Sequence, residues 1–384
     1  MRLTLLQNSI IIKCVRMRER SRKRFSRRVT AEESSVMKKN LAIVGYGGQG
    51  AWHANWAGKS DVVSLAGIYD IAEKRVKAAI DNGIKVYGSL EELLADKSVD
   101  IVLCATPNDV HKDIVIKALE AKKHVICEKP VALSVGDFDD MVKASEDNGV
   151  FFTVHQNRRW DVDYLAIKSL IESGEIGDVI NIESRVHGSR GIPSDWRCHK
   201  PYGGGMILDW GVHLIDQMLK LITEKIKAVY CEITNITTDE VDDGFNLHLI
   251  FESGKRATVE VGTYNFIAMP RFYMQAKSGS ALIEDWQKKC KVAKLKAWCE
   301  KEVLPVQTAA GITKTMAPRD EITIDSYEIE RPTSDVHDFY RNFTAAIDGE
   351  CEQLIKNCEV RRVLLVMEAA FKSAELGEAM KVNI

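Results

Sequence analysis

Short apolar runs alternate with amphipathic stretches over residues 40–156. A run of roughly four to eight apolar residues is typical of a buried strand, and apolar positions three or four residues apart are typical of a helix. Their alternation predicts βαβ units, and therefore an α/β domain with a doubly wound parallel sheet. The predicted strands are 41–44, 62–69, 85–87, 100–105, 124–127 and 150–155, and the predicted helices include 90–94, 110–121 and 134–148.

The pattern changes after residue 156. Strand-like runs follow one another there, and Glu252-Ser253-Gly254-Lys255 has the composition of a hairpin turn. Consecutive strands predict a largely antiparallel sheet in a second, α+β domain. Its predicted strands are 179–186, 227–236, 245–252, 255–264 and 272–277, and its predicted helices are 162–173, a segment after residue 205, 335–348 and 360–376. We place the two domains at residues 37–156 and 157–384.

Residues 284–320 fit neither pattern. The stretch is rich in lysine and contains Trp286 and Trp298. Two interpretations stay open, namely an insertion that covers the functional site and a solvated loop.

Length and charge agree with this two-domain picture. A chain of 384 residues exceeds the usual single domain, and 28% charged with 45% hydrophobic residues is ordinary for a soluble protein. The net charge of −2 hides ten Lys/Arg against three Glu in residues 1–36, so the remainder is mildly acidic. This balance argues against a nucleic-acid partner. Since no apolar run approaches the ~18 residues of a membrane span, we expect no membrane partner either.

The nine cysteines contain no CxxC pair, and several of them lie in apolar runs. This usage indicates a reducing compartment, which we take to be the cytoplasm. Cys198-His199 is the one adjacent thiol and imidazole pair, and no second pair lies nearby to complete a zinc site. We therefore expect no metal.

Residues 1–36 form a basic extension. Their arginine-rich, acid-poor composition would suit an organellar transit peptide. The simpler interpretation is that Met37 is the natural start and that the preceding residues are extra translated sequence or a disordered tail. We leave this segment out of the fold prediction.

A glycine pattern follows the first predicted strand. Gly45, Gly47 and Gly50 form GxGxxG between an apolar run and a helix, with Gly48 and Gln49 inside the motif. In a dinucleotide-binding fold the first glycine makes a tight turn, the second lets the backbone approach a pyrophosphate, and the third lets helix and strand pack closely. The strand before the motif and the helix after it favour nicotinamide dinucleotide binding.

Asp70 ends the second predicted strand, twenty residues after Gly50. A carboxylate there can accept hydrogen bonds from the adenosine ribose and would repel a 2′-phosphate, so we predict NAD rather than NADP. Lys74 and Arg75 weaken this preference. Asp70 and Glu73 also have the spacing of a capping box, which is compatible with ribose binding.

Two further strand ends carry polar residues, Thr106-Pro107-Asn108 and Glu128-Lys129-Pro130. In open α/β sheets ligands bind beyond the carboxyl ends of the strands. Lys129 can present its ammonium to a substrate oxygen there, whereas a solvent-facing loop lysine is the structural alternative.

Three consecutive glycines, 203–205, precede a predicted helix that carries Asp209 and His213. The glycines let the backbone come close to a ligand, and the i, i+4 spacing puts carboxylate and imidazole on one helix face. A proton-handling pair is the functional interpretation. An exposed ion pair of small energetic worth is the alternative.

Together these motifs resemble those of the Gfo/Idh/MocA oxidoreductase family, which includes glucose–fructose oxidoreductase, inositol dehydrogenases and many sugar dehydrogenases. The resemblance runs from about Met37 to the C-terminus. It rests on four motifs in the family's order, which are Gly45-Tyr46-Gly47-Gly48-Gln49-Gly50, Ala105-Thr106-Pro107-Asn108 with His111, Glu128-Lys129-Pro130, and Gly203-Gly204-Gly205 leading to Asp209 and His213.

The resemblance implies a Rossmann domain followed by a domain with an open-faced sheet, with the nicotinamide between them. It implies that Lys129, Asp209 and His213 are the catalytic residues. Since family members commonly form dimers or tetramers through the exposed sheet, we expect a homodimer or homotetramer. The cofactor-binding residues that it implies, besides the glycine motif and Asp70, are Thr106, Asn108, His111, Glu128 and Lys129, together with Trp196 and Arg197.

Trp196 and Arg197 resemble a family pair that reaches the cofactor or the sugar. A tryptophan at this position could equally belong to the core. Both interpretations stay open.

Elementary chemistry agrees with the catalytic roles. Oxidation of a secondary alcohol by hydride transfer needs a base for the hydroxyl proton, and an imidazole with an ordinary pKa near ~6.5 suits that task. We therefore expect His213 to be the base, Lys129 to stabilise the developing negative charge on oxygen, and Asp209 to orient substrate and imidazole. Asn157 and Arg159 are expected on the substrate side, with an ordinary surface loop as the alternative.

A site of carboxylate, imidazole, ammonium and amide groups suits a polyhydroxylated ligand. We therefore expect an NAD-dependent dehydrogenase that acts on a sugar, a glycoside or an inositol. Three alternatives stay open: a glycosidase that oxidises its substrate transiently, a non-catalytic NAD-binding sugar sensor, and an enzyme like biliverdin reductase. The presence of Lys129 and His213 disfavours the sensor, and the Asp209/His213 pair disfavours the reductase.

Overall fold

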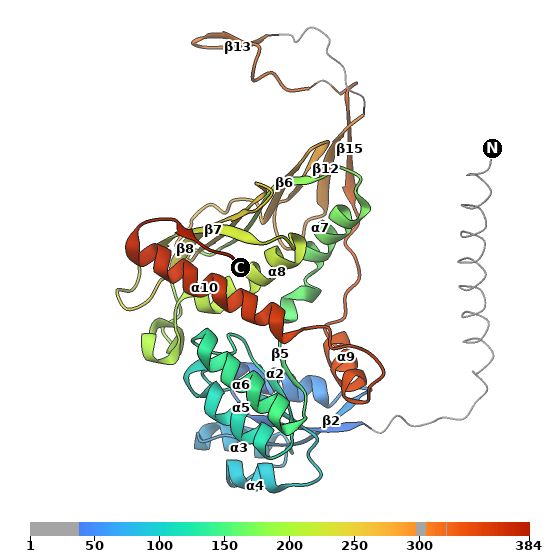
Figure 1. Ribbon diagram of the computed structural model, residues 1–384, viewed down its shortest axis with the longest axis vertical. Coiled ribbons are helices and arrows are strands. Elements are labelled where there is room, and N and C mark those ends of the chain that lie inside the picture. The colour runs from blue at the N-terminus through green and yellow to red at the C-terminus, as the bar shows by residue number, and fades with distance from the viewer. Residues whose placement is uncertain (1–37, 297–304, 320) are drawn as a thin grey trace, which may run out of the picture. The chain divides into compact units, whose positions relative to one another are not determined.

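The first sheet contains five parallel strands in the order β2-β1-β3-β4-β5. The structure, a computed structural model, describes residues 38–296, 305–319 and 321–384, and all elements below refer to those residues (Figure 1). The predicted extension at 1–36 and Trp298 lie outside them. The strands are β1 (Lys39–Val44), β2 (Val63–Tyr69), β3 (Ile101–Cys104), β4 (His124–Cys127) and β5 (Phe152–Val154).

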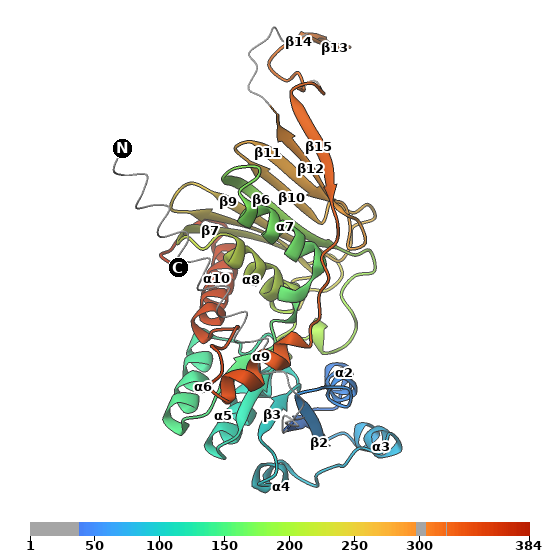
Figure 2. The same ribbon diagram turned by 90° about the vertical axis from the view of Figure 1, so that its right-hand side faces the viewer.

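Helices cover both faces of this sheet, with α5 and α6 on one side and α2 on the other (Figure 2). Leu41 to Val44 of β1 are at most 2% exposed, because a strand covered on both faces buries every side chain. The predicted Rossmann arrangement is therefore confirmed. The helices are α2 (Gly48–Ala57), α3 (Glu73–Asp81), α4 (Leu90–Ala95), α5 (His111–Glu120) and α6 (Val135–Asn148).

Two local predictions in this region are wrong. Residues 85–87 do not form a strand, because only the middle residue pairs with the sheet, in an isolated bridge to Ile68. Asp70 does not cap α3, because the helix begins at Glu73 and its N-cap residue is Ala72, which provides no side-chain hydrogen bond. The carboxylate of Asp70 instead accepts a hydrogen bond from the main-chain N–H of Ala72 at 2.8 Å.

The second sheet has the strand order β15-β12-β11-β10-β6-β9-β8-β7-β16 within the described residues. Only β6 and β9 pair in parallel, so the predicted largely antiparallel sheet is confirmed. The hairpin turn predicted between β8 and β9 is also present, with Gly254 at φ +91°. The strands are β6 (Val179–His187), β7 (Ile226–Thr234), β8 (Gly244–Phe251), β9 (Arg256–Gly262), β10 (Phe272–Ala276), β11 (Gly279–Ile283), β12 (Cys290–Leu295), β15 (Ile324–Ile329) and β16 (Met380–Lys381).

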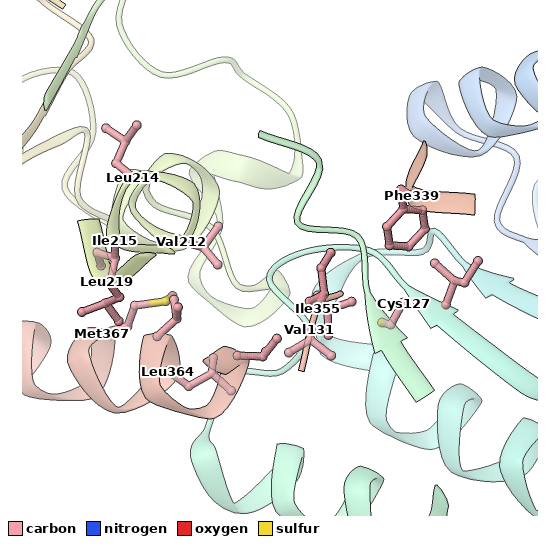
Figure 3. Packing of buried hydrophobic residues seen from close by; sticks show 14 of the residues in the cluster. Cys127, Val131, Val212, Leu214, Ile215, Leu219, Phe339, Ile355, Leu364 and Met367 are labelled. Atoms are coloured by element: carbon pink, nitrogen blue, oxygen red, sulfur yellow. The ribbon is translucent and has the colours of Figure 1, made fainter. Parts of the chain in front are cut away.

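Three helices, α7 (Val162–Ser173), α8 (Val212–Leu221) and α10 (Asn357–Leu376), pack on one face of the second sheet (Figures 1 and 2). Figure 3 shows Ile215 and Leu219 of α8 facing Leu364 and Met367 of α10, and all four side chains are at most 5% exposed. α8 therefore lies beside α10 on the same face of the sheet. The N-terminal end of α8 carries His213, and Asp209 lies in the turn just before it.

The opposite face of the second sheet is polar. Arg185 of β6 donates to Glu260 of β9 at 2.8 Å and also pairs with Glu183 on its own strand. Side chains alternate between the two faces of a strand, so these charges lie on the face away from the helices. The sheet is open-faced, as predicted.

Part of the stretch 284–320 belongs to this sheet. Residues 290–295 form strand β12, in which two of the six residues are lysines that interrupt the apolar run. Strand β13 (Val306–Thr308) pairs with β14 (Gly311–Thr313) as a separate hairpin. Trp286 lies between β11 and β12, and its ring approaches that of Trp210 with centroids 6.0 Å apart. The turn at Trp286 therefore reaches the helix with the predicted catalytic residues.

No described helix is both long enough and apolar enough to cross a bilayer. Every cysteine in the described part of the chain has a free thiol.

Candidate active site

The glycine motif lies at the carboxyl end of β1 and opens α2. Gly45 has φ +92°, and a Cβ there would lie 2.7 Å from the carbonyl oxygen of Ala105. A Cβ on Gly50 would lie 1.9 Å from the carbonyl oxygen of Gly45. A Cβ on Gly47 or Gly48 would meet nothing within 4 Å. The outer glycines are thus required by packing, and the open space at the inner ones fits a phosphate group at the N-terminus of α2.

Asp70 lies beside this loop at the end of β2. Its Oδ2 accepts a hydrogen bond from the main-chain N–H of Tyr46 at 2.6 Å. The carboxylate therefore links the second strand to the glycine loop. It remains half-buried, where its free lone pairs can face a ribose.

Lys129 follows β4 and pairs with the second domain. Its Nζ lies 2.9 Å from both the main-chain oxygen and the Oδ1 of Asp209, while Arg197 donates from Nε to Oδ2 at 3.2 Å. Burial alone would raise the pKa of Asp209, but the two cations outweigh it and hold the pKa below its usual value. The structure therefore brings together Lys129, which follows a strand of the first sheet, and Asp209, which lies in the turn before α8.

His213 lies one turn further along, at the start of α8, and is 4% exposed. Burial lowers its pKa well below the usual value, and Lys129 and Arg158 lower it further. Its Nδ1 has no hydrogen-bond partner among the described residues. The imidazole is therefore neutral at neutral pH and able to accept a proton.

The expected contact between Asp209 and His213 is not formed. Residues 207–211 form a π-helical turn before α8, so the i, i+4 relation of a regular α-helix does not apply. Both carboxylate oxygens of Asp209 bind the cations Lys129 and Arg197 instead. In this structure Asp209 positions the lysine and not the imidazole.

The three glycines before this turn approach other protein groups and not open space. A Cβ on Gly203 would lie 2.5 Å from Leu133, one on Gly204 would lie 2.3 Å from the carbonyl oxygen of Arg197, and one on Gly205 would lie 2.2 Å from Asp242. The expectation that these glycines admit a ligand is wrong. They let loops from both domains close around the start of the helix.

Asn108, His111 and Glu128, predicted to bind cofactor, are all buried and hold main-chain segments. Asn108 donates to the carbonyl oxygen of Gly203 at 3.0 Å. The ring nitrogens of His111 lie 3.1 Å and 3.0 Å from the carbonyl oxygens of Pro130 and Thr106, so this histidine ties together the two loops beyond β3 and β4.

Thr106 is half-buried, and its hydroxyl lies 3.3 Å from the Sγ of Cys104. Gln49 is exposed at the start of α2. Both residues stay predicted cofactor contacts.

Two buried groups have ligand atoms close enough together for a metal ion, although no metal site was predicted. Their members are Cys104, His111 and Cys127, and His53, Glu128 and His155.

Trp196 and Arg197 lie in the loop before the glycines. The guanidinium of Arg197 lies 4.6 Å from the centre of the Trp196 ring, which is half-buried. Trp196 is therefore not a core residue, and the pair borders Asp209.

Arg159 is not on the substrate side. Its guanidinium is buried, binds both carboxylate oxygens of Asp216 at 2.6 Å and 2.7 Å, and also reaches Glu359 at 2.7 Å. Burial would lower its pKa, but these carboxylates raise it. Arg159 is a structural residue that links α8 to α10.

The neighbouring Arg158 instead lies over Trp210, the residue after Asp209. Its guanidinium lies 4.1 Å from the centre of the Trp210 ring and 5.5 Å from that of Trp286, close enough to His213 to lower its pKa. Asn157 is half-buried, and its Oδ1 has no partner among the described residues. The local sequence Asn-Arg-Arg-Trp does not indicate that the two arginines have different environments. Trp286, which Arg158 approaches, is 128 positions away from it in the chain.

Comparison with known proteins matches two segments of the chain. Residues 39–156 match an oxidoreductase family with an NAD-binding Rossmann fold, and residues 164–281 match the Gfo/Idh/MocA C-terminal domain. The solved structure of an NAD-binding protein from Listeria innocua is 43% identical, covers 90% of this chain and 99% of its own, and superposes with a TM-score of 0.87.

The curated relatives are more distant. An uncharacterised oxidoreductase of Schizosaccharomyces pombe is 35% identical over 48% of this chain and 51% of its own. The scyllo-inositol 2-dehydrogenase (NADP(+)) of Bacillus subtilis is 29% identical over 62% of this chain and 67% of its own. The chain spans about half the length of the first of these relatives.

Proposed function

Because the chain belongs to the Gfo/Idh/MocA family of oxidoreductases, we propose that it is an NAD-dependent dehydrogenase that oxidises a secondary hydroxyl of a sugar, a glycoside or an inositol to a ketone. The observation that carries this proposal is the Lys129 ammonium, held by Asp209 beside the buried neutral His213. Residues 37–156 would bind the cofactor, and residues 157–384 would complete the substrate site.

The residues present fit a nicotinamide dinucleotide. The open space at Gly47 and Gly48 would admit its phosphates, and the carboxylate of Asp70 would face the adenosine ribose. Bound NAD would supply the hydride acceptor. Gln49 and Thr106 would border it.

Lys129 and His213 would divide the work on the substrate hydroxyl. An ammonium has three N–H donors, and Asp209 engages two of those of Lys129. The third is free to donate to the substrate oxygen and to stabilise the negative charge that develops there. His213 would take the hydroxyl proton as hydride leaves carbon, which its neutral state permits.

The surroundings of this centre suit a polyhydroxylated ring. Arg197 adds donors beside Asp209, and the charge of Arg158 acts on His213. The buried Oδ1 of Asn157 has no partner among the described residues. A ligand with many hydroxyl groups would satisfy such groups. The inositol dehydrogenases among the relatives support this substrate class.

The decisive experiment follows NADH absorbance with purified protein, NAD and a panel of inositols, free sugars and glycosides. We expect turnover with at least one of them. His213→Ala should lower this turnover by ~10²–10⁴-fold. The matched control is His199→Ala, an exposed histidine that pairs with Glu240, and it should keep the turnover.

Near-normal turnover of His213→Ala would remove this residue from the mechanism. Release of sugar from a glycoside without net NADH would indicate the glycosidase alternative. Bound NAD without any turnover across the panel would indicate a sugar sensor.

We propose NAD over NADP because Asp70 would repel a 2′-phosphate. The Bacillus subtilis relative is named for NADP, so the preference has to be measured on this chain. The ratio of kcat/KM for the two cofactors should favour NAD, and Asp70→Ser should shift the ratio toward NADP. A wild-type preference for NADP would contradict the assignment.

We also propose a homodimer or homotetramer in the cytoplasm. The polar, uncovered face of the second sheet, with Glu183, Arg185 and Glu260, would be the contact surface. Light scattering after size exclusion should give a multiple of the chain mass, and Arg185→Glu should reduce it.

A further inference from the structure

Four buried titratable side chains lie together next to Lys129. The proposed mechanism does not use any of them. They come from α2, from the end of β4, from the residue after β5 and from α9 (Asp338–Ile347). Each is at most 5% exposed. The four residues are His53, Glu128, His155 and Tyr340.

The hydrogen bonds of this cluster define one arrangement of protons. The Oε1 of Glu128 lies 2.8 Å from Nε2 of His53 and 2.9 Å from Nδ1 of His155. A carboxylate can only accept, so both nitrogens must carry hydrogen. The Nδ1 of His53 is then free to accept from the hydroxyl of Tyr340, which contacts it.

The carboxylate of Glu128 is the ionised group of the cluster. Burial alone would raise the pKa of Glu128, but His155 and His53 outweigh it and hold the pKa well below its usual value. Burial lowers the pKa of His53 to about 4, so this ring is neutral at neutral pH. An ionised carboxylate thus lies between two histidine N–H groups inside the protein.

This carboxylate also reaches the catalytic lysine. The Oε2 of Glu128 accepts a hydrogen bond from the main-chain N–H of Lys129 at 3.1 Å. Besides burial, Lys129, Arg158 and His155 lower the pKa of His213, whereas Glu128 raises it. Glu128 is therefore placed to act on both catalytic residues without touching substrate.

We propose that His53, Glu128, His155 and Tyr340 form a positioning cluster that fixes the main chain of Lys129 and supplies the negative charge that offsets Lys129 at His213. The proposal rests on the proposed function, and it changes the expected role of Glu128 from a cofactor contact to a residue that acts through Lys129. Tyr340 extends the cluster to α9.

The same three nitrogen and oxygen atoms of His53, Glu128 and His155 could surround a divalent ion. The hydrogen-bonded arrangement is favoured because both nitrogen–oxygen distances are ordinary for hydrogen bonds. It is also favoured because the Tyr340 hydroxyl donates to the remaining nitrogen of His53. Metal analysis of the purified protein separates the two.

The first test uses amide side chains as partial copies of histidine. His155→Asn keeps a donor near the position of Nδ1, and His53→Gln keeps one near Nε2, whereas leucine at either position removes it. We expect the leucine variants to lose ~10-fold or more in kcat, as loss of a hydrogen bond to a buried charge implies, and the amide variants to stay within ~3-fold. The KM for NAD should change little, and thermal unfolding shows which variants are folded.

The second test needs no substrate. His213 is titrated by NMR with ¹³C-labelled histidine, and its signal is assigned by its loss in His213→Gln. Glu128→Gln should lower the pKa of His213 further, because the negative charge that favours imidazolium is gone. Lys129→Met should raise it, because the largest opposing charge is gone.

Three results would overturn the proposal. The first is an unchanged titration of His213 in folded Glu128→Gln. The second is an equal loss of kcat in the leucine and amide variants. The third is a stoichiometric metal ion that is lost in Glu128→Gln. Because the titration is independent of turnover, failure of the dehydrogenase proposal appears separately, as absence of NADH across the substrate panel.

Discussion

Two glycine-rich segments lead into helices at the candidate site, and their glycines serve different purposes. In the first, the Cβ positions of Gly47 and Gly48 have no atom within 4 Å. In the second, each of the glycines 203–205 has a protein atom 2.2–2.5 Å from its Cβ position. Open space at a glycine marks room for a ligand, whereas occupied space marks a close contact within the protein.

The difference assigns a task to each segment. The first forms the surface on which we place the cofactor phosphates. The second joins the two domains, because Gly203 receives a hydrogen bond from Asn108 of the first domain and Gly205 packs on Asp242 of the second. Asp209, four residues later, is thereby held within reach of Lys129.

The largest effect at a fixed pH is expected at Gly50, which belongs to the first segment but is required by packing. A Cβ there would lie 1.9 Å from the carbonyl oxygen of Gly45, so the backbone must move. Gly50→Ala should lower the free energy of unfolding by ~3 kcal/mol or more, measured by urea denaturation. Gly48→Ala is the matched control in the same helix and should unfold at wild-type urea concentration or higher. Equal stability of both variants would contradict the distinction between occupied and open glycines.

A pH-dependent effect is expected from Asp242, which the second segment encloses. Its Oδ2 accepts from the main-chain N–H of Ile207 at 2.7 Å, and burial raises its pKa to about 7. The folded protein therefore holds a proton that the unfolded chain has released between about pH 4 and pH 7. The contribution of Asp242 to stability should therefore fall as pH rises through that window, by on the order of 4 kcal/mol, whereas the buried neutral His53 and His213 contribute in the opposite direction.

Asp242→Asn should remove this contribution, because an amide does not titrate, so the variant should gain stability relative to the wild type as pH rises. Urea denaturation of both proteins at pH 4.5 and pH 7.5 measures it. An exposed aspartate such as Asp325 gives the control substitution, Asp325→Asn, which should leave the wild-type slope unchanged. An equal pH dependence of stability in the wild type and in Asp242→Asn would show that Asp242 is ionised in the folded state.

Features encoded by neighbouring residues could be predicted from the sequence. Strand β4 and helix α7 occupy the residues expected for them, because their apolar periodicity and their ends are local properties. The glycine motif could be interpreted for the same reason. Its strand, turn and helix follow one another directly.

Features set by distant residues could not be predicted in this way. Arg158 and Arg159 are adjacent in the sequence. Arg159 alone binds the carboxylate of Asp216, which lies 57 positions after it in the chain. The partners of Asp209 depend on a π-helical turn whose geometry has no simple sequence signature. The role of Glu128 depends on histidines contributed by two other elements.

The sharpest test of the comparison has the smallest effect on stability. Gly47 has φ −77°, an angle that any residue adopts, and its Cβ position is open, so Gly47→Ala should unfold within ~0.5 kcal/mol of the wild type. If the open space receives the cofactor phosphates, the added methyl group should raise the Kd for NAD on the order of 10-fold, equivalent to ~1.4 kcal/mol. Calorimetric titration with NAD measures this. Gly136→Ala is the control, because Gly136 lies in α6 and a Cβ there would meet only the hydroxyl of Ser134, at 3.9 Å. A Kd for NAD unchanged in Gly47→Ala would mean that the open space at this loop is not where the dinucleotide binds.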